Sequence, residues 1–375
     1  MLRREHIGRT EEDERYPNNC RHPVSDESTR FHLQVNRSLC LALTNLQSTI
    51  LHLSDLRPVT AVLSPLTFEP IFMERIWGSH RLASQFGKKL PPTATIGESW
   101  EIVDRPEAQS IVRNGPLRGR TLHELWTHDR EAIFGGVTDS SRFPLLVKLL
   151  DAHDTLSLQV HPPEKVAAKL GGEPKTEFWY VAFAIPGAKI LAGLRQAITR
   201  DEFEKAVRDG NVADLVHTIP VQTGDSIFLP AGRFHAVGAG NVLVEIQQNS
   251  DTTYRVFDWK RLDDKGKPRQ LHVEQALESI DFTDVAPKLT DPEGETLVKR
   301  ELFEIQKWNL DTPREIVGSG QFAIVCCLTG GIRLVDVDLR PGEFLLVPAS
   351  LQDRQLQPRS EETTLLRITI PGRGD

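Results

Sequence analysis

Four side chains that could bind a metal ion lie in two stretches of the chain, residues 159–177 and 224–235. Gln159 and His161 alternate in one β-rich run, Glu177 falls in a second, and His235 follows a Pro-x-Gly turn. Side chains two residues apart in a strand point to the same face, so Gln159 and His161 would face one direction. Two imidazoles, a carboxylate and an amide oxygen suit a divalent ion of borderline hardness. The set predicts one metal site per chain, suited to an ion such as Zn²⁺.

The elements that would position these donors are short β-rich runs separated by proline and glycine. From about Leu63 onward such runs recur, and regular short strands with turn signals predict a sandwich or barrel. Helical patterns are few. The capping-box pattern Thr199-x-x-Glu202 predicts a short helix that ends near Gly210, and a second is expected over residues 273–279. The fold class expected is therefore mainly β with a few short helices.

Composition excludes several classes of partner. The 375 residues carry a formal net charge of −7 and contain no long basic run, which argues against a nucleic-acid binder. No apolar run approaches the roughly 20 residues needed to cross a bilayer, so no membrane partner is expected. The first thirty residues lack the apolar segment of a secretory signal. The adjacent Cys326 and Cys327 lie in an apolar run, which favours reduced thiols and a cytoplasmic protein.

An internal repeat suggests how the chain is divided. The segment Gly224–Gly232 is similar to Gly342–Ser350, and the same register aligns His235 with Asp353. Both segments are typical of one strand-turn unit of a jelly roll, although two β-turns can also be similar by chance. The second copy lacks the histidine. We therefore expect three parts: a polar N-terminal extension over residues 1–60, disordered or loosely docked; a metal-binding domain over 61–290, with its small helical segment near 199–210; and a metal-free, degenerate jelly roll over 296–375.

Longer motifs connect this pattern to a known family. The spacing Gly-x5-Pro-x-Gly-x2-His matches the second motif of the cupin superfamily, and the alternating donors followed by a glutamate match the first. From about Leu63 to Pro371 the chain resembles type I phosphomannose isomerases, in particular the short bacterial form. The blocks that carry the resemblance, in order along the chain, are residues 74–78, 97–101, 143–148, 156–162, 175–180, 245–251 and 253–258.

The resemblance implies a fold, a metal and a reaction. It implies a cupin jelly-roll barrel with Zn²⁺ held by Gln159, His161, Glu177 and His235. It also implies reversible interconversion of mannose 6-phosphate and fructose 6-phosphate through an enediol, so a hexose 6-phosphate is the expected partner. Larger members carry a helical insertion, which here is absent or reduced to the helix near Thr199. The sequence leaves open whether the chain is a monomer or a homodimer.

Such a substrate needs an anchor for its phosphate. Arg255, Lys260 and Ser157 are the candidates, because arginine offers a planar fork and lysine a point charge to phosphate oxygens. Ser157 would share a strand face with Gln159, and the resemblance places a serine near the phosphate. The alternative for the two cations is an ion pair with Asp258 or the nearby Asp263. Arg261 could replace Lys260, and Arg255 is also a catalytic candidate.

The residue that transfers the proton between C1 and C2 is expected among buried charges. Glu245 lies in an apolar strand run. Apolar neighbours would raise the pKa of its carboxyl, which could then exchange protons with the substrate. Lys148, the second candidate, would be costly to bury without a partner and could steady the enediolate or pair with Glu245 or Glu177. Trp100, between two acids, could stack on a sugar ring or anchor the core.

Two other functions are compatible with parts of this pattern. A non-catalytic cupin that binds a sugar phosphate would keep the anion-binding residues without needing a base. Another metal-dependent cupin enzyme, such as an iron-dependent oxygenase or a glucose-6-phosphate isomerase, would keep the metal. An oxygenase favours two histidines and one carboxylate, so Gln159 as a fourth donor argues against it.

Overall fold

The computed structural model describes residues 63–137, 140–263 and 265–371. All of these residues belong to one compact unit, Pro58–Asp375. The N-terminal extension predicted over residues 1–60 lies outside the described residues.

A six-stranded and a five-stranded antiparallel sheet form the first half of the described chain. The six-stranded sheet has the order β1 (Ile71–Ser79), β2 (Ile96–Ile102), β5 (Leu145–Ala152), β12 (Asn241–Gln248), β7 (Glu177–Ala184) and β10 (Ser226–Leu229). The five-stranded sheet has the order β13 (Tyr254–Phe257), β6 (Leu158–Val160), β11 (His235–Val237), β8 (Lys189–Leu194) and β9 (Val216–Pro220). The chain crosses between the two sheets repeatedly, as in a jelly roll.

A second pair of antiparallel sheets follows. The five-stranded sheet has the order β14 (Thr296–Lys299), β15 (Glu304–Leu310), β22 (Thr363–Thr369), β17 (Ala323–Thr329) and β20 (Phe344–Val347). The four-stranded sheet has the order β16 (Arg314–Glu315), β21 (Gln355–Pro358), β18 (Ile332–Leu334) and β19 (Val337–Leu339). The repeated segment thus forms β10 in the first jelly roll and β20 in the second, each at the edge of its sheet.

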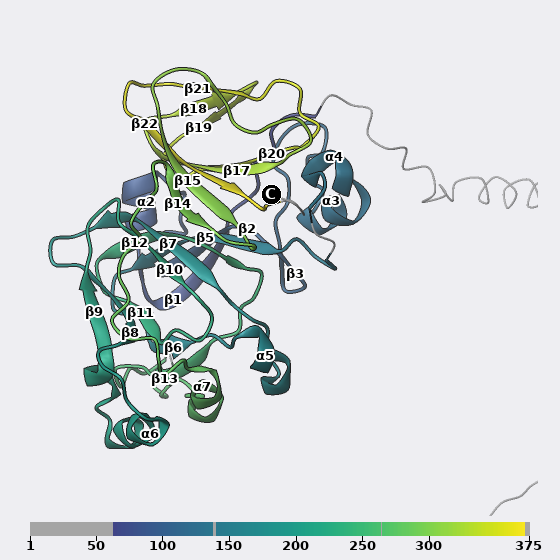
Figure 1. Ribbon diagram of the computed structural model, residues 1–375. Helices are drawn as coiled ribbons and strands as arrows, with labels where there is room; N and C mark the ends of the chain where they lie inside the picture. Colours follow the sequence, from purple (N-terminus) through teal and green to yellow (C-terminus); the bar gives the residue numbers. More distant parts are fainter. Residues whose placement is uncertain (1–62, 138–139, 264, 372–375) are drawn as a thin grey trace, which may run out of the picture. The chain divides into compact units, whose positions relative to one another are not determined.

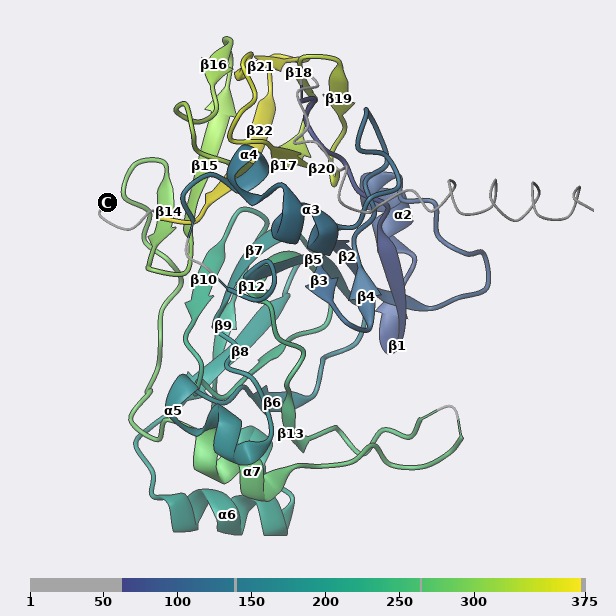
Figure 2. The ribbon, with the colours of Figure 1, turned by 90° about the vertical axis from the view of Figure 1, so that its right-hand side faces the viewer.

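The helices are short and lie around the sheets (Figure 2). They are α2 (Arg81–Phe86), α3 (Leu122–His128), α4 (Arg130–Phe134), α5 (Glu164–Ala167), α6 (Arg200–Asp209) and α7 (Val273–Ser279), with 3-10 turns η1 (Ala168–Leu170) and η2 (Val212–Leu215) and a small hairpin of β3 (Asp104–Arg105) and β4 (Ala108–Gln109). The predicted capping box begins α6: Thr199 accepts from the Glu202 N–H, and Glu202 accepts from the Thr199 N–H. No helix of the described residues has the length and apolar character to cross a membrane.

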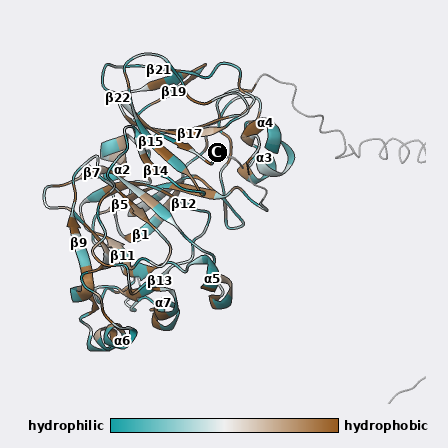
Figure 3. Cartoon of the chain, viewed as in Figure 1, coloured by the Kyte–Doolittle hydropathy of each residue, from teal (hydrophilic) through white to brown (hydrophobic). Residues whose placement is uncertain are grey.

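Strand periodicity gives each sheet two faces with different partners. Hydrophobic and hydrophilic residues are interleaved along the strands (Figure 3). One set of side chains fills the first jelly roll, as Trp179 and Leu243 do, and another fills the second, as Val325 and Leu365 do. Side chains on the opposite faces of the six-stranded sheet and of the second five-stranded sheet meet between the two jelly rolls. Central strands such as β5 are therefore buried along their whole length, because both of their faces pack against apolar side chains.

The two jelly rolls share one apolar core. Val147, Phe178 and Val244 of the six-stranded sheet belong to the same buried cluster as Ile324 and Leu366 of the second five-stranded sheet. Figure 1 shows the second pair of sheets against the first, with α3 and α4 beside the junction. The prediction of a mainly β fold with two jelly rolls and few short helices is confirmed.

Candidate active site

Three of the four predicted metal donors converge inside the first jelly roll. The ligand atoms of His161, Glu177 and His235 lie within 4.8 Å of one another, and all three residues are buried. His161 Nε2 lies 3.3 Å from Glu177 Oε1, and His235 Nε2 lies 3.7 Å from Glu177 Oε2. The fourth, Gln159, places its amide Nε2 3.4 Å from His235 Nε2.

Strand pairing brings these remote residues together. His235 begins β11 directly opposite Gln159 of β6, and Glu177 begins β7 opposite the last residue of β10. The turn between β10 and β11 needs glycine, because Gly232 has a φ of 96°. The Gly232 N–H donates to the His161 carbonyl at 2.9 Å, which fixes the turn against the ligand strand.

Backbone carbonyls orient both imidazoles. Nδ1 of His161 lies 2.8 Å from the Thr252 carbonyl, and Nδ1 of His235 lies 2.8 Å from the Arg233 carbonyl. Since a carbonyl only accepts, each Nδ1 carries the proton and each Nε2 turns a lone pair inward. Burial lowers the pKa of both histidines, that of His161 to about 3, where the nearby charge of Lys175 adds to the effect.

The inward-facing atoms fit a divalent cation. Among the described residues, His161 Nε2 and Glu177 Oε2 are buried and have no hydrogen-bond partner. Two neutral imidazole nitrogens and a carboxylate present only electron pairs to the space between them. Such a set is stable in a protein interior when a positive charge faces it. Lys175 Nζ, 2.9 Å from Glu177 Oε1, contributes part of that charge.

A cavity of about 390 Å³ lies beside the donors. Charged residues of both signs dominate its lining. The cations are Arg75, Lys148, Lys175, Arg255 and Arg269, the acids are Glu98, Glu177, Glu245 and Asp251, and Trp77, Ser157, Gln159, Trp179 and Thr253 are among the other lining residues. Cations gathered beside metal donors suit an anionic substrate that also presents oxygens to the metal.

The predicted anion-binding residues divide into two groups. Ser157 and Arg255 line the cavity, and the buried Arg255 Nε has no hydrogen-bond partner among the described residues. Lys260 is not among the lining residues of the described chain; it follows β13 in a turn, with a φ of 58°. Arg269 lines the cavity instead, and its guanidinium donates to Asp258 at 2.5 and 2.7 Å.

The alternative ion pair with Asp258 is made by other arginines. Arg261 donates to Asp258 at 2.5 Å and to the Thr155 carbonyl at 2.7 Å, so it supports the turn. Arg255 donates to the Gln270 carbonyl at 2.9 Å. The described contacts of Arg255 therefore leave part of its guanidinium available to the cavity.

A row of alternating charges crosses the cavity wall. Lys148 Nζ lies 2.9 Å from Glu245 Oε1 and 3.8 Å from Glu98 Oε2, and Arg75 donates to Glu98 at 2.9 and 3.3 Å. Lys148 and Glu245 are direct partners across β5 and β12. Trp179 Nε1 donates to the second oxygen of Glu245 at 3.0 Å. The pairing of Lys148 with Glu245, one of the predicted alternatives, is confirmed.

These charges have different protonation behaviour. Burial alone would lower the pKa of Lys148, but the charges of Glu245 and Glu98 outweigh burial and raise it above its ordinary value, so Lys148 stays protonated. Burial likewise opposes ionisation of Glu98, yet Lys148 and Arg75 lower its pKa to about 2. Burial and the charge of Glu177 raise the pKa of Glu245 to about 7. Glu245 is thus the carboxyl in this row that can exchange a proton near neutral pH.

Trp100 is a core residue. It is 1 % exposed, packs with Val103 and Leu146, and donates from Nε1 to Glu98 at 2.7 Å. Of the two predicted roles, the structure supports the core anchor.

Comparisons with known proteins identify the family. The model of the phosphomannose isomerase type I catalytic domain matches residues 66–178. The chain is 37% identical over 303 residues to a mannose-6-phosphate isomerase of Streptococcus mutans, and the aligned residues cover 76% of this chain and 95% of that protein. The chain belongs to the type I phosphomannose isomerase family. The predicted family, and the prediction that the chain is an enzyme of it, are confirmed.

Other family members agree in sequence and fold. Bacillus subtilis mannose-6-phosphate isomerase ManA is 36% identical over 310 residues, covering 79% of this chain and 97% of that protein. A crystal structure of the mannose 6-phosphate isomerase from Bacillus subtilis superposes with a TM-score of 0.74 at 34% identity, covering 82% of this chain and 100% of that chain. The predicted fold of the phosphomannose isomerase family thus extends over the described chain.

Several residues of this phosphomannose isomerase site were missed in the sequence. Lys175 could have been found, because it lies two residues before Glu177 and so shares its face, the rule that identified Ser157. Trp179, two residues after Glu177 in β7, carried the same signal, whereas Arg75 and Arg269 had none. They reach the cavity through pairing and side-chain contacts between segments that are remote in the chain.

Proposed function

We propose that this chain interconverts mannose 6-phosphate and fructose 6-phosphate, using one Zn²⁺ bound by Gln159, His161, Glu177 and His235. The observation that carries the proposal is the convergence of His161, Glu177 and His235 on a cavity. The same cavity holds an arginine Nε with no hydrogen-bond partner among the described residues and a carboxyl of raised pKa. The names of the curated relatives supply the substrate.

The donor set leaves room for substrate. Catalytic zinc sites have three protein ligands and keep an open position, and a weak neutral Gln159 oxygen fits that need better than a closed site of four thiolates. Gln159 presents Nε2 toward His235 in the structure, and a half-turn of its amide would present the oxygen. When bound, the metal would stabilise the negative charge that develops on the sugar oxygens of an enediol.

Glu245 is proposed as the group that carries the proton between C1 and C2. A base works best when its pKa lies near the working pH, and the pKa of about 7 satisfies that condition. Lys148 stays protonated, so it is the weaker candidate for a base. Its ammonium group and the Trp179 N–H instead hold the carboxyl of Glu245 in place.

The phosphate is proposed to bind at Arg255, with Arg269 and Ser157 beside it. The buried Arg255 Nε has no hydrogen-bond partner in the described part of the chain. The nearby Arg269 adds to the effect of burial in lowering the pKa of Arg255. A dianionic phosphate would relieve that repulsion between like charges. Arg269 takes the role predicted for Lys260.

The two jelly rolls are proposed to divide the work. Residues 61–290 would form the catalytic domain, and residues 296–375 a metal-free domain with a packing role. The shared apolar cluster supports this, because the second jelly roll covers the outer face of the sheet that carries Lys148, Glu177 and Glu245.

A coupled assay on mannose 6-phosphate tests the proposal. Protein stripped with a chelator should lose turnover, and added Zn²⁺ should restore it. A Glu245→Gln variant should bind Zn²⁺ normally and turn over slowly. Absence of fructose 6-phosphate from protein that contains stoichiometric Zn²⁺ would contradict the proposal, as would full activity after the metal has been removed.

A further inference from the structure

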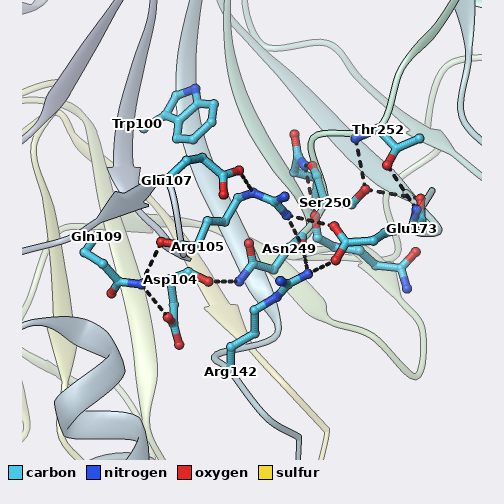
Figure 4. Close-up of polar contacts among 12 residues, drawn as sticks. Trp100, Asp104, Arg105, Glu107, Gln109, Arg142, Glu173, Asn249, Ser250 and Thr252 are labelled. Carbon is cyan, nitrogen blue, oxygen red and sulfur yellow. Dashed lines mark hydrogen bonds and ion pairs between the residues drawn. The ribbon is translucent and has the colours of Figure 1, made fainter. Parts of the chain in front are cut away.

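Two arginines from different segments converge on one carboxylate (Figure 4). Arg105, at the end of β3, donates to Glu173 Oε2 at 2.9 Å. Arg142, in the segment that precedes β5, donates to Glu173 Oε1. Glu173 lies between η1 and β7, four positions before the ligand Glu177. We call Arg105, Arg142 and Glu173 the arginine clamp.

The same arginines hold a second segment. Arg105 and Arg142 each donate to the Asn249 carbonyl, at 3.0 and 3.1 Å. The Asn249 side chain is itself fixed, since Nδ2 donates to the carbonyls of Asp104 and Phe143, both at 2.7 Å. The clamp therefore joins the start of the loop between β12 and β13, residues 249–253, to the segment of Glu173.

Three hydrogen bonds connect the clamp to the ligand His161. Ser250 Oγ donates to the Glu173 carbonyl at 3.2 Å, and the Glu173 N–H donates to Thr252 Oγ1 at 3.0 Å. The Thr252 carbonyl then accepts from His161 Nδ1 at 2.8 Å. The position of this carbonyl decides the orientation and tautomer of the imidazole.

We propose that the arginine clamp is a positioning device for the metal centre. By fixing Glu173, it holds the Thr252 carbonyl against His161 and, along the chain, aligns the segment that delivers Lys175 and Glu177. This inference rests on the proposed metal site. Groups that orient a metal-bound histidine through its second nitrogen contribute strongly to metal affinity.

The geometry argues against an ordinary surface ion pair. Exposed pairs contribute little because the two side chains are free to separate in water. Here the shared carboxylate of Glu173 is 38% exposed, but Arg105 is only 12% and Arg142 27% exposed. Both arginines also share one carbonyl, and the hydrogen bonds lead from the clamp to a proposed metal donor. Loss of the clamp should therefore affect the metal site more than an isolated pair would.

Zn²⁺ affinity, measured by competition with a chromophoric chelator, tests the clamp without any substrate. Glu173→Ala should weaken Zn²⁺ binding by more than twofold, but by less than the about 10- to 100-fold that follows loss of a direct partner of a ligand, because the backbone hydrogen bonds of residue 173 to Ser250 and Thr252 remain. Arg142→Ala, which leaves Arg105 in place, should weaken it less, and Arg142→Lys should restore part of the loss. Glu278→Ala is the matched control: it breaks the exposed Arg200–Glu278 pair, also 2.9 Å long, and should leave Zn²⁺ affinity unchanged.

The outcomes distinguish failure of the clamp proposal from failure of the proposed metal site. If wild-type protein binds no Zn²⁺, the proposed metal centre fails first. If it binds Zn²⁺ and both Glu173→Ala and Arg142→Ala bind within twofold of it, the clamp proposal is wrong. Equal weakening in Glu278→Ala would also contradict the clamp, because it would indicate general destabilisation. Circular dichroism of the metal-free variants checks the fold, and the milder Arg142→Ala decides the matter if Glu173→Ala does not fold.

Discussion

The two jelly rolls have corresponding strand orders but different interiors. The run β5-β12-β7-β10 of the first corresponds to β15-β22-β17-β20 of the second. Glu177 pairs with Leu229, and Ala323 pairs with Val347, which holds the same place in the repeated segment. A buried carboxylate in one jelly roll is thus a methyl group in the other.

The differences continue along the next strands. Glu245 pairs with Trp179, whereas Arg367 pairs with Val325 at the equivalent place. Arg367 is held by structural contacts: it donates to the Ile316 carbonyl at 2.7 Å and lies over the Trp308 ring. The same strand arrangement therefore accommodates different inward-facing residues, and a few of these positions decide whether a jelly roll can bind a metal.

Removing a ligand should give the largest contrast between the jelly rolls. His235→Ala takes away one of three converging donors, so Zn²⁺ binding and turnover should be abolished. Its register counterpart, Asp353→Ala, should keep both, because Asp353 is an exposed residue before β21. Metal content and coupled turnover of the two purified variants check this. Retained turnover in His235→Ala would remove the basis of the comparison.

Glu245→Gln should leave the metal in place and lower kcat by about 10²- to 10⁴-fold, the range for loss of a general base. The matched change in the second jelly roll, Arg367→Gln, should alter stability without altering kcat. Steady-state kinetics with metal analysis measure both. A Glu245→Gln enzyme with normal kcat would assign the proton transfer to another group.

The pH profile sharpens the same assignment. The pKa of Glu245 is raised to about 7 by burial and by the charge of Glu177. A base acts when it is deprotonated, so kcat/KM of the wild type should fall as pH drops through that value. The residual activity of Glu245→Gln should lack this step. Profiles of equal shape in the two proteins would show that the step belongs to another residue.

The candidate metal donors could be picked out in the sequence because their signals are local. Gln159 and His161 follow the period of a strand, and His235 follows a turn whose glycine has a positive φ. Residues that depend on contacts between remote segments were not. The turn after β13 takes Lys260 away from the cavity, while Asp258 draws Arg269 in. The arginine clamp joins four segments, and no sequence period indicates such a meeting.

A cavity made by substitution inside the second jelly roll should lower stability and leave activity nearly unchanged. Leu345→Ala removes a fully buried side chain from the apolar core of the second jelly roll. It should lower the free energy of unfolding by about 2–5 kcal/mol. At a temperature where the variant remains folded, kcat should stay within a few-fold of the wild type. Urea unfolding and turnover check the two parts, and a large loss of kcat in folded protein would assign the second domain more than packing.

The charged interior of the first jelly roll should make its stability depend on acid. The charges of Lys148 and Arg75 hold the folded pKa of Glu98 at about 2 despite burial, below its ordinary 4.5. A carboxylate with a lowered folded pKa stabilises the protein above its unfolded pKa, and this contribution is lost as pH falls from about 4.5 toward 2. Metal-free wild type should therefore lose stability relative to Glu98→Gln over that interval.

The second jelly roll supplies the control for this experiment. Leu345→Ala changes no titrating group, so its difference from wild type in urea unfolding should be the same at pH 7 and at pH 3.5. The difference in the free energy of unfolding between wild type and Glu98→Gln should instead narrow at the lower pH, because protonation removes the same carboxylate charge that the substitution has already removed. A constant difference for Glu98→Gln would show that the carboxylate is not held by Lys148 and Arg75 in solution. The contrast between a charged and an apolar interior would then have no consequence for acid stability.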